Sequence, residues 1–541
     1  MTSQRSLTAD DLILSVPLGD DVEGTRQSGF GHGCSFLVVF LWAFLGVGTM
    51  VCAWSFATPI GAAPDEPAHV AQAAAVVRGQ FDGPTRHYAI GELGIVRVPG
   101  WAADNWAPCF VKDDAFTDPK QTGVAAACGD TVITTTTPAS AATQFFNAPP
   151  LYYLVAGIPS LFLSGEPALY AMRVLPGLLN AALVALGIAL LARYHPRRAP
   201  LVGALIALTP MVLFVMAVVN SSGLEISSGF ATWCGALCVA EYPQLPRALA
   251  IWTAVAAVLL VLSRPTSALD LAAVVVVMAF FIGWRRLRER LNRTLAPLWI
   301  PVVVAVVVAG GFILVCGSPH LTGVAPAHPV GLLSNMWTNL RQTGADLRQC
   351  IGNFGWLDTP VPMWVVIVWG SCVAGLVALA LALSASCRRA LPVLVLSILA
   401  LPEVLFAPEM NTFSGDWQGR YWLPLAVGIP LVASTFRWPV RSHVHRRTDR
   451  ERIAPALVLG LGLVLFAAQL GSFTHALTRY ETGLGVRAGA PTVWLPPGGH
   501  DPVVIAFVVG SLLTLALVVF MMLPRMKFDS VRGSAPTGAC R

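Results

Sequence analysis

Long, uninterrupted apolar blocks are the feature that most constrains this chain. Residues 271–281 and 301–315, for example, contain no charged side chain. A bilayer core requires about 20 apolar residues per helix, and many blocks approach that length. The blocks are too long and too uniform for barrel strands, whose lipid-facing and lumen-facing residues alternate. Only 12% of the 541 residues are charged, against roughly 25% in soluble domains. The sequence therefore predicts an all-α integral membrane protein.

About twelve blocks are long enough to be interpreted as transmembrane helices. Each comes close to the length that a bilayer demands. The predicted spans are residues 35–58, 169–194, 200–219, 224–242, 248–263, 268–284, 295–316, 363–387, 391–407, 421–436, 453–473 and 503–523.

Arginine-rich connectors predict the orientation of these spans. Short loops rich in Lys and Arg stay in the cytoplasm, and placing all of them there makes the span count alternate correctly. Both termini are then cytoplasmic, and the protein is predicted to be a multi-pass protein of a bacterial plasma membrane. The net charge of +6 reflects these clusters and does not indicate nucleic-acid binding. The clusters lie at residues 193–198, 285–293, 388–389, 437–452 and 525–527.

The same scheme predicts the organisation of the chain. Residues 1–34 form a cytoplasmic tail, and 35–436 form a transmembrane core with a large first outer loop, 59–168, and a second outer loop, 317–362. Residues 437–541 hold the last two helices and a short cytoplasmic tail.

Residues 147–163 are apolar, yet a span there would invert every later connector. We therefore interpret this segment as a short interfacial or re-entrant helix. Its aromatic pair, Tyr152 and Tyr153, is expected at the level of the lipid headgroups.

The strongest candidate for chemistry follows the first span, in the sequence PDEPAH. Asp65 and Glu66 are adjacent carboxylates close to the predicted membrane exit. If Pro64 opens a helix, Asp65 and His69 share one face at i,i+4 spacing, and His69 is a substrate-binding candidate. Carboxylates near a bilayer are costly unless they are paired or functional, which favours a catalytic role. The structural alternative is a helix N-terminus whose acids favour its dipole.

Three arginines lie at predicted outer helix ends, where the positive-inside rule disfavours them. They are Arg173, Arg264 and Arg420. A guanidinium binds phosphate through a planar fork, and the phosphates of lipid carriers lie at this depth. We interpret the three as substrate-binding candidates. The alternative is that they reach ordinary lipid headgroups.

The second outer loop supplies weaker candidates. Trp337 and Trp356 could stack on sugar faces, with Asp358 beside the latter, although tryptophan is also a common interfacial anchor. In the first outer loop, Cys109 and Cys128 are predicted to form a disulfide, because that compartment is oxidising. A metal site is the alternative, but no CxxC or HxxxH spacing supports it.

The segments PDEPAH, NAPPLYY, NFGWLDTP and QGRYWLP resemble a bacterial family of polytopic membrane proteins named only as a domain of unknown function. That family is similar to the GT-C class of glycosyltransferases. The resemblance covers nearly the whole chain, from the first span through Pro424. It implies transfer of a sugar from a polyprenyl-phosphate donor outside the membrane, with inversion. It also implies an acidic base in the first outer loop, which matches Asp65 with Glu66 as neighbour. Gln418, Arg420 and Tyr421 of QGRY are then expected to bind substrate.

The leading hypothesis is thus a membrane glycosyltransferase that acts on an envelope glycan or glycolipid acceptor. A carboxylate takes the acceptor proton, and arginine stabilises the charge that grows on the leaving phosphate. No cofactor is expected to be obligatory, and a divalent cation stays possible. The alternatives are a lipid or glycolipid transporter or flippase, and a non-catalytic envelope assembly protein.

Overall fold

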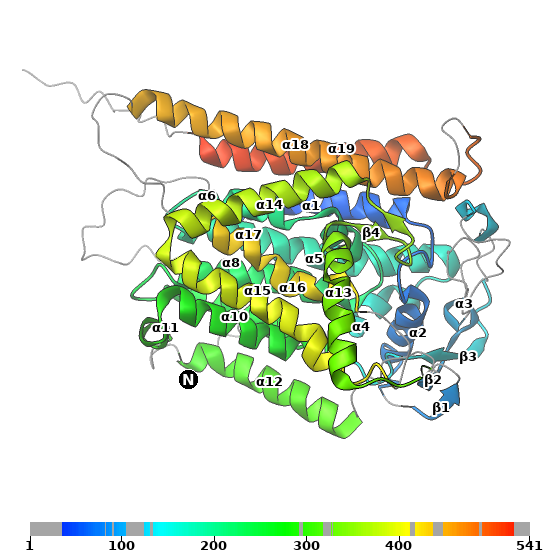
Figure 1. Cartoon of the computed structure of the whole chain (residues 1–541). Helices are drawn as coiled ribbons and strands as arrows, with labels where there is room; N and C mark the ends of the chain where they lie inside the picture. The colour runs from blue at the N-terminus through cyan, green and yellow to red at the C-terminus, as the bar shows by residue number, and fades with distance from the viewer. Residues whose placement is uncertain are drawn as a thin grey trace, which may run out of the picture. The chain divides into compact units, whose positions relative to one another are not determined.

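The structure is a computed structural model, and the described part of the chain is mostly helical (Figure 1). It describes residues 35–81, 83–88, 91–103, 124–129, 134–291, 296–316, 326, 328–411, 417–436, 447–485 and 490–523. The predicted tail 1–34 and the residues beyond 523 lie outside the described residues. Everything below concerns the unit that begins at Phe36.

The helices of the bundle follow the predicted apolar blocks. Three of them begin at a side chain that caps the first turn: Thr209, Asn220 and Ser384 each accept a backbone N–H. The bundle helices are α1 (Phe36–Ala57), α5 (Gly165–Tyr194), α6 (Ala199–Ala207), α7 (Pro210–Met216), α8 (Ser221–Val239), α9 (Arg247–Val261), α10 (Ser267–Ile282), α11 (Trp284–Arg290), α12 (Ala296–Cys316), α14 (Met363–Leu383), α15 (Ala385–Leu405), α16 (Leu423–Ala426), α17 (Gly428–Ala433), α18 (Arg447–Thr482) and α19 (His500–Met522).

Five described helices are long and apolar enough to cross a membrane, or up to seven candidate spans if each bent pair counts as one. The five are α1, α5, α14, α19 and the Pro455–Thr482 part of α18. The α6–α7 pair bends by 66° at the break before Pro210, and the α10–α11 pair bends by 112° at Gly283, whose φ is 93°. The membrane class is thus borne out, whereas the count of about twelve spans is not established by length and composition.

The core is formed where the first and last helices meet the rest of the bundle. α1 packs between α5 and α19, and α8 packs between α5 and α9. Small residues allow the close approach: a Cβ on Gly46 would lie 2.4 Å from Oγ1 of Thr514, and one on Gly510 would lie 2.6 Å from the carbonyl oxygen of Gly46. Trp54 is buried among aromatic rings, with Phe354 at 4.8 Å between centroids.

The described residues between α1 and α5 fold against one end of this bundle. They contain α2 (Glu66–Val76), α3 (Gly100–Ala103), α4 (Pro150–Gly157), the 3-10 turns η2 (Ala126–Gly129) and η3 (Ile158–Leu161), and an antiparallel sheet of β1 (Thr85–Tyr88), β2 (Gly91–Pro99) and β3 (Pro138–Thr143) in the order β1-β2-β3. The register pairs Arg86 with Leu93 and Val96 with Ala141.

The segment 147–163 contains a short helix, α4, that continues as η3 and packs against α2. Tyr152 and Tyr153 are buried, at 1% and 0% exposure. The prediction that they lie among lipid headgroups is therefore wrong. A Cβ on Gly157 would lie only 2.1 Å from the carbonyl oxygen of Ala73, so glycine permits the α2–α4 contact that draws the tyrosines inward.

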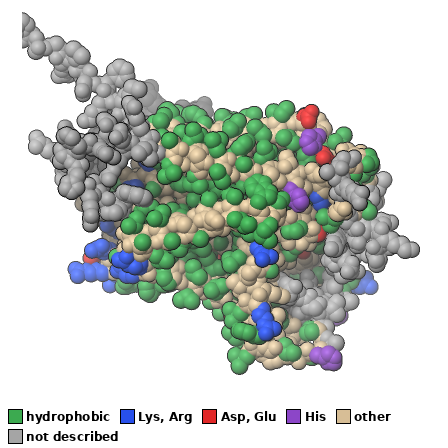
Figure 2. All heavy atoms as spheres, turned by 45° about the horizontal axis from the view of Figure 1, so that its top comes forward, with side chains coloured by type: hydrophobic (Ala, Val, Ile, Leu, Met, Phe, Trp, Pro, Cys, Tyr) green, Lys and Arg blue, Asp and Glu red, His purple; other side chains and the backbone are tan. Residues whose placement is uncertain are grey.

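The second predicted outer loop contributes α13 (Leu332–Ile351) and a two-stranded sheet of β4 (Asn353–Phe354) and β5 (Thr359–Pro360). We call the end of the bundle that carries α2, the three-stranded sheet and α13 the loop end. At the opposite end of the bundle, Arg193 lies in the last turn of α5, and further arginines lie along α11. Figure 2 shows a group of blue side chains beside a broad hydrophobic band. This polarity agrees with the arginine clusters of the sequence.

Candidate active site

Asp65 and Arg420 form an ion pair at the loop end. Nη2 of Arg420 donates to Oδ2 of Asp65 at 2.6 Å, and Nε2 of Gln144 donates to Oδ1 at 3.2 Å. Asp65 precedes the first turn of α2 in the left-handed conformation, with φ of 61°, which is uncommon for a residue other than glycine. Its side chain is 25% exposed, whereas that of Arg420 is 3% exposed. The partly exposed carboxylate of Asp65 thus contacts the buried guanidinium of Arg420.

Arg420 is held in place by the 3-10 turn η5 (Gly419–Trp422), which lies against α13. Gly419 donates its N–H to Oε1 of Gln349 at 2.8 Å, and its carbonyl accepts from Sγ of Cys350 at 3.1 Å. A Cβ at position 419 would lie 2.1 Å from the backbone oxygen of Asp346, so only glycine allows this approach.

Two guanidinium groups meet at the ring of Tyr421. The Cζ of Arg264 lies 5.0 Å from the ring centroid and that of Arg420 lies 5.1 Å from it, both within cation–π range. Nη2 of Arg420 also donates to the Tyr421 hydroxyl at 3.1 Å. Among the described residues, Nε and Nη1 of Arg420 have no hydrogen-bond partner. Buried guanidinium nitrogens without a partner suit an anionic ligand.

Gln418 precedes this turn, and its Oε1 is buried without a partner among the described residues. The structure therefore brings together Asp65, Arg264, Gln418, Arg420 and Tyr421, all of which the sequence had singled out.

Arg264 is positioned by acidic residues that the sequence analysis missed. Nη1 of Arg264 lies 3.3 Å from Oε2 of Glu225, and Oε1 of Glu225 accepts from the Ser267 hydroxyl at 2.6 Å. Asp270, in the first turn of α10, is also buried, at 4% exposure. Acidic residues inside the predicted spans 224–242 and 268–284 were the available signal.

His69 lies beside the ion pair in the first turns of α2. Its Nδ1 is 2.9 Å from the Tyr153 hydroxyl, and its ring stacks on Phe145 at 3.7 Å between centroids. Burial lowers the pKa of His69 well below its usual value, and the nearby charges of Arg420 and Arg264 lower it further. The imidazole is therefore neutral at physiological pH.

The side chain of Glu66 pairs with Arg173, whereas that of its neighbour Asp65 pairs with Arg420. Each carboxylate oxygen of Glu66 accepts one hydrogen bond from Arg173 at 2.6 Å and one backbone N–H at 3.1 Å, from Val219 or Gly61. Both side chains are almost fully buried, at 2% and 1% exposure. Arg173, predicted as a substrate ligand or a headgroup contact, thus joins α5 to the start of α2.

The weaker candidates lie around this framework. Nε1 of Trp356 donates to the Gly61 carbonyl at 2.9 Å, and Asp358 forms a buried ion pair with Arg479 at 2.9 Å. Trp337 is exposed on α13. The predicted disulfide cannot be located, because Cys109 and the side chain of Cys128 lie outside the described residues. No group of three or more His, Cys, Asp or Glu side chains that could hold a metal ion occurs in the described part of the chain.

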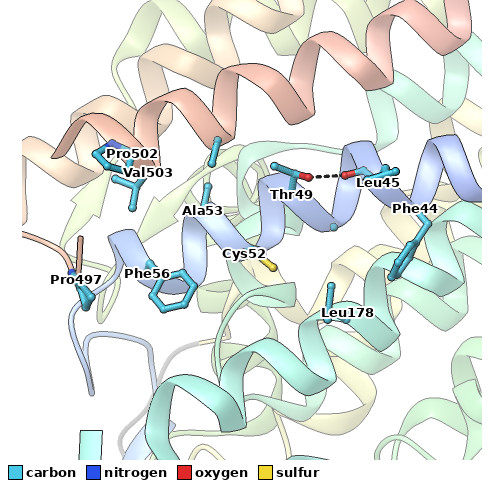
Figure 3. A pocket seen from close by; sticks show the side chains of 12 residues that line it. Phe44, Leu45, Thr49, Cys52, Ala53, Phe56, Leu178, Pro497, Pro502 and Val503 are labelled. Carbon is cyan, nitrogen blue, oxygen red and sulfur yellow. Dashed lines mark hydrogen bonds between the residues drawn. The ribbon is translucent and has the colours of Figure 1, made fainter. Parts of the chain in front are cut away.

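A cavity of about 420 Å³ lies between α1, α5 and α19 (Figure 3). Its walls are apolar, with Phe44, Phe56 and Leu178 among them, and the Thr49 hydroxyl already donates to the carbonyl of Leu45 at 2.7 Å. It offers no charged group for a phosphate, which distinguishes it from the Asp65–Arg420 site.

The long apolar helices identify a helical membrane protein, and buried ion pairs lie at the loop end of its bundle. More specifically, the chain belongs to the family described as "Predicted membrane protein (DUF2142)", which matches residues 49–429. The family resemblance of the sequence is therefore confirmed. Among curated proteins, none matches. Among solved structures, the crystal structure of ArnT from Cupriavidus metallidurans in the apo state has a TM-score of 0.40 and 13% identity, covering 90% of this chain and 78% of that chain. A likeness of that degree carries no argument about the reaction.

Proposed function

We propose that this protein is a membrane glycosyltransferase that moves a sugar from a polyprenyl-phosphate donor to a glycan or glycolipid acceptor. The reaction takes place at the loop end, on the extracytoplasmic side of a bacterial plasma membrane. The observation that carries the proposal is the Asp65–Arg420 pair, in which a partly exposed carboxylate adjoins a buried guanidinium that has two unpartnered nitrogens.

In this mechanism the donor phosphate binds to the free nitrogens of Arg420 and to Arg264. Asp65 takes the proton from the acceptor hydroxyl, whose oxygen forms a bond to the anomeric carbon as the bond from that carbon to the phosphate oxygen breaks. The polyprenyl phosphate leaves with the bonding electrons, and the two guanidinium groups stabilise its added charge. A single displacement inverts the anomeric centre.

Asp65 takes the role of base in this proposal because Glu66 has no free acceptor position. Four hydrogen bonds saturate the Glu66 carboxylate, and its side chain is 2% exposed. We assign Glu66 and Arg173 the task of holding α2 in place so that Asp65 faces Arg420. Neutral His69 supports the same face of α2 through Tyr153.

The carboxyl pair of Glu225 and Asp270 favours a second candidate function. Ionisable groups within membrane helices often mark proton or substrate pathways, so a lipid transporter or flippase would also use two such buried carboxyls, which are 2% and 4% exposed. Transfer of labelled sugar to an acceptor supports the enzyme, whereas movement of an intact lipid-linked sugar across vesicles without transfer supports the transporter.

The test uses the full chain in nanodiscs, a panel of polyprenyl-phosphate sugars carrying a radiolabel, and envelope glycan fragments as acceptors. Wild type is compared with Asp65→Asn. Asp501→Asn is the matched control, because Asp501 is exposed in the first turn of α19. We expect transfer by wild type and by the control and its loss in Asp65→Asn. Full transfer by Asp65→Asn contradicts the proposal.

A further inference from the structure

Helix α13 buries three polar residues on its inward side. Asn335, Asn339 and Asp346 are each 3% exposed. Nδ2 of Asn335 donates to the Ala407 carbonyl at 2.9 Å, and Nδ2 of Asn339 donates to the Pro402 carbonyl at 3.3 Å, both at the end of α15. A helix on a water-soluble surface has the opposite arrangement, with its apolar side buried.

The other side of α13 carries an exposed apolar stripe. Leu333, Trp337, Leu340 and Leu347 are 81%, 56%, 47% and 51% exposed. Their spacing of four, three and seven residues places them on one helix face. Large apolar side chains gathered in this way mark a surface that meets a protein partner or a membrane.

The placement of α13 indicates what this stripe faces. Figure 1 shows the helix crosswise to α14 and α15 at the loop end. Candidate span α14 likewise exposes apolar residues in its first turns, Met363 at 54% and Ile367 at 61%. A helix that lies crosswise to spans at their ends and exposes an apolar face is placed to lie along the interface of a bilayer.

We propose that the stripe of α13 docks on the lipid bilayer at the loop end. Two exposed arginines, Arg341 and Arg348, flank it, and the Cζ of Arg341 lies 5.2 Å from the ring centroid of Trp337. Tryptophan and arginine both suit the headgroup layer, where the guanidinium meets lipid phosphate. Pairing with the same stripe of a second copy would instead bring like charges together.

The docked helix also bears on the candidate active site. The last turn of α13 holds Gly419 through Gln349 and Cys350, and Gly419 precedes Arg420. Contact with the bilayer therefore fixes the element on which the Arg420 turn rests. This inference goes beyond the proposed function, since the docking stands whether or not the site transfers a sugar.

Spin labels on the full chain in liposomes test the docking. A nitroxide is attached at Leu340→Cys or Leu347→Cys, and the signal of the chain without the added cysteine is subtracted. Collision rates with oxygen, which dissolves in lipid, and with a water-soluble nickel chelate are measured. Ile367→Cys on α14 serves as the lipid reference. Arg285→Cys on α11, whose side chain is 93% exposed, serves as the aqueous reference.

We expect both α13 labels to follow the lipid reference, with frequent oxygen collisions and a several-fold loss of nickel collisions relative to Arg285→Cys. Nickel collisions as frequent as at Arg285→Cys would show a water-facing stripe and overturn the proposal. Protection from both reagents would show that a second copy or another protein covers α13, and would also overturn it.

Discussion

Oδ2 of Asp65 lies 2.6 Å from Nη2 of Arg420, although 355 positions of the chain separate the two residues. The pair joins the first loop element after α1 to the turn that opens α16. It places the proposed base and the proposed phosphate ligand within one hydrogen bond of each other. A donor phosphate that binds to Arg420 therefore brings its anomeric carbon close to Asp65.

Arg420→Lys is expected to lower sugar transfer by at least about tenfold, because an ammonium keeps the charge but lacks the planar fork that grips phosphate. Loss of one positioned donor to a developing anion commonly costs about 10²–10³-fold in rate. Initial rates at saturating acceptor measure the effect. Arg285→Lys, at an exposed position on α11, is the matched control. Equal rates for the two variants would rule out a role for Arg420 in the reaction.

Glu66→Gln is expected to destabilise the fold, because it leaves the buried Arg173 without its counter-charge. Breaking a buried ion pair by removing one partner typically costs about 3–5 kcal/mol. The melting temperature of the purified protein in detergent reports the loss. We also expect the double variant Glu66→Gln/Arg173→Met to recover part of it, since no buried charge then lacks a partner. A melting temperature equal to that of wild type in Glu66→Gln would contradict the role assigned to this pair.

Stability is expected to fall as the pH is lowered below about 6.5, the usual pKa of an unfolded histidine. Burial, then Arg420 and Arg264, lower the pKa of His69 in the folded protein. Between the two pKa values only the unfolded chain binds the proton, so stability present above the unfolded pKa is lost as the pH falls toward the folded one. Melting temperatures from pH 7.5 to 5.5 measure this slope, which should be smaller in His69→Gln. An unchanged slope would show that other groups cause it.

Asp270→Asn is expected to keep most of the activity and stability of wild type. Glu225 forms the ion pair with Arg264 and accepts from Ser267, whereas Asp270 forms no ion pair among the described residues, so a neutral amide at position 270 breaks no charge pair. Glu225→Gln removes the counter-charge of Arg264 and should weaken binding of the lipid phosphate. Titration with a polyprenyl phosphate compares the two variants. Weaker binding in Asp270→Asn than in Glu225→Gln would reverse this assignment.

The sequence predicted the membrane class, the polarity of the bundle and the residues at its loop end. These predictions rest on signals that a single chain carries, namely apolar length and the position of charges relative to it. Asp65, Arg264 and Arg420 all lie at the ends of apolar blocks, and the fold brings them together.

Other features depend on contacts that no local pattern reveals. Asp65 and Glu66 look equivalent in sequence, yet a left-handed residue at the start of α2 directs one toward Arg420 and the other toward Arg173. Tyr153 is inside the protein because glycine lets α4 approach α2. The number of spans is obscured where the break before Pro210 divides the predicted span 200–219, and where α9 and α10 have only 15 and 16 residues.

The central claim is that Asp65 is the base of a glycosyl transfer, and the first measurement is transfer by wild type and Asp65→Asn in nanodiscs. Both proteins are first shown to bind a polyprenyl phosphate with similar affinity, which establishes that the variant is folded. We predict product from wild type and a loss of at least about a hundredfold in Asp65→Asn, in the range of general base catalysis. Binding by both proteins with no transfer from wild type, or equal transfer by both, would contradict the account.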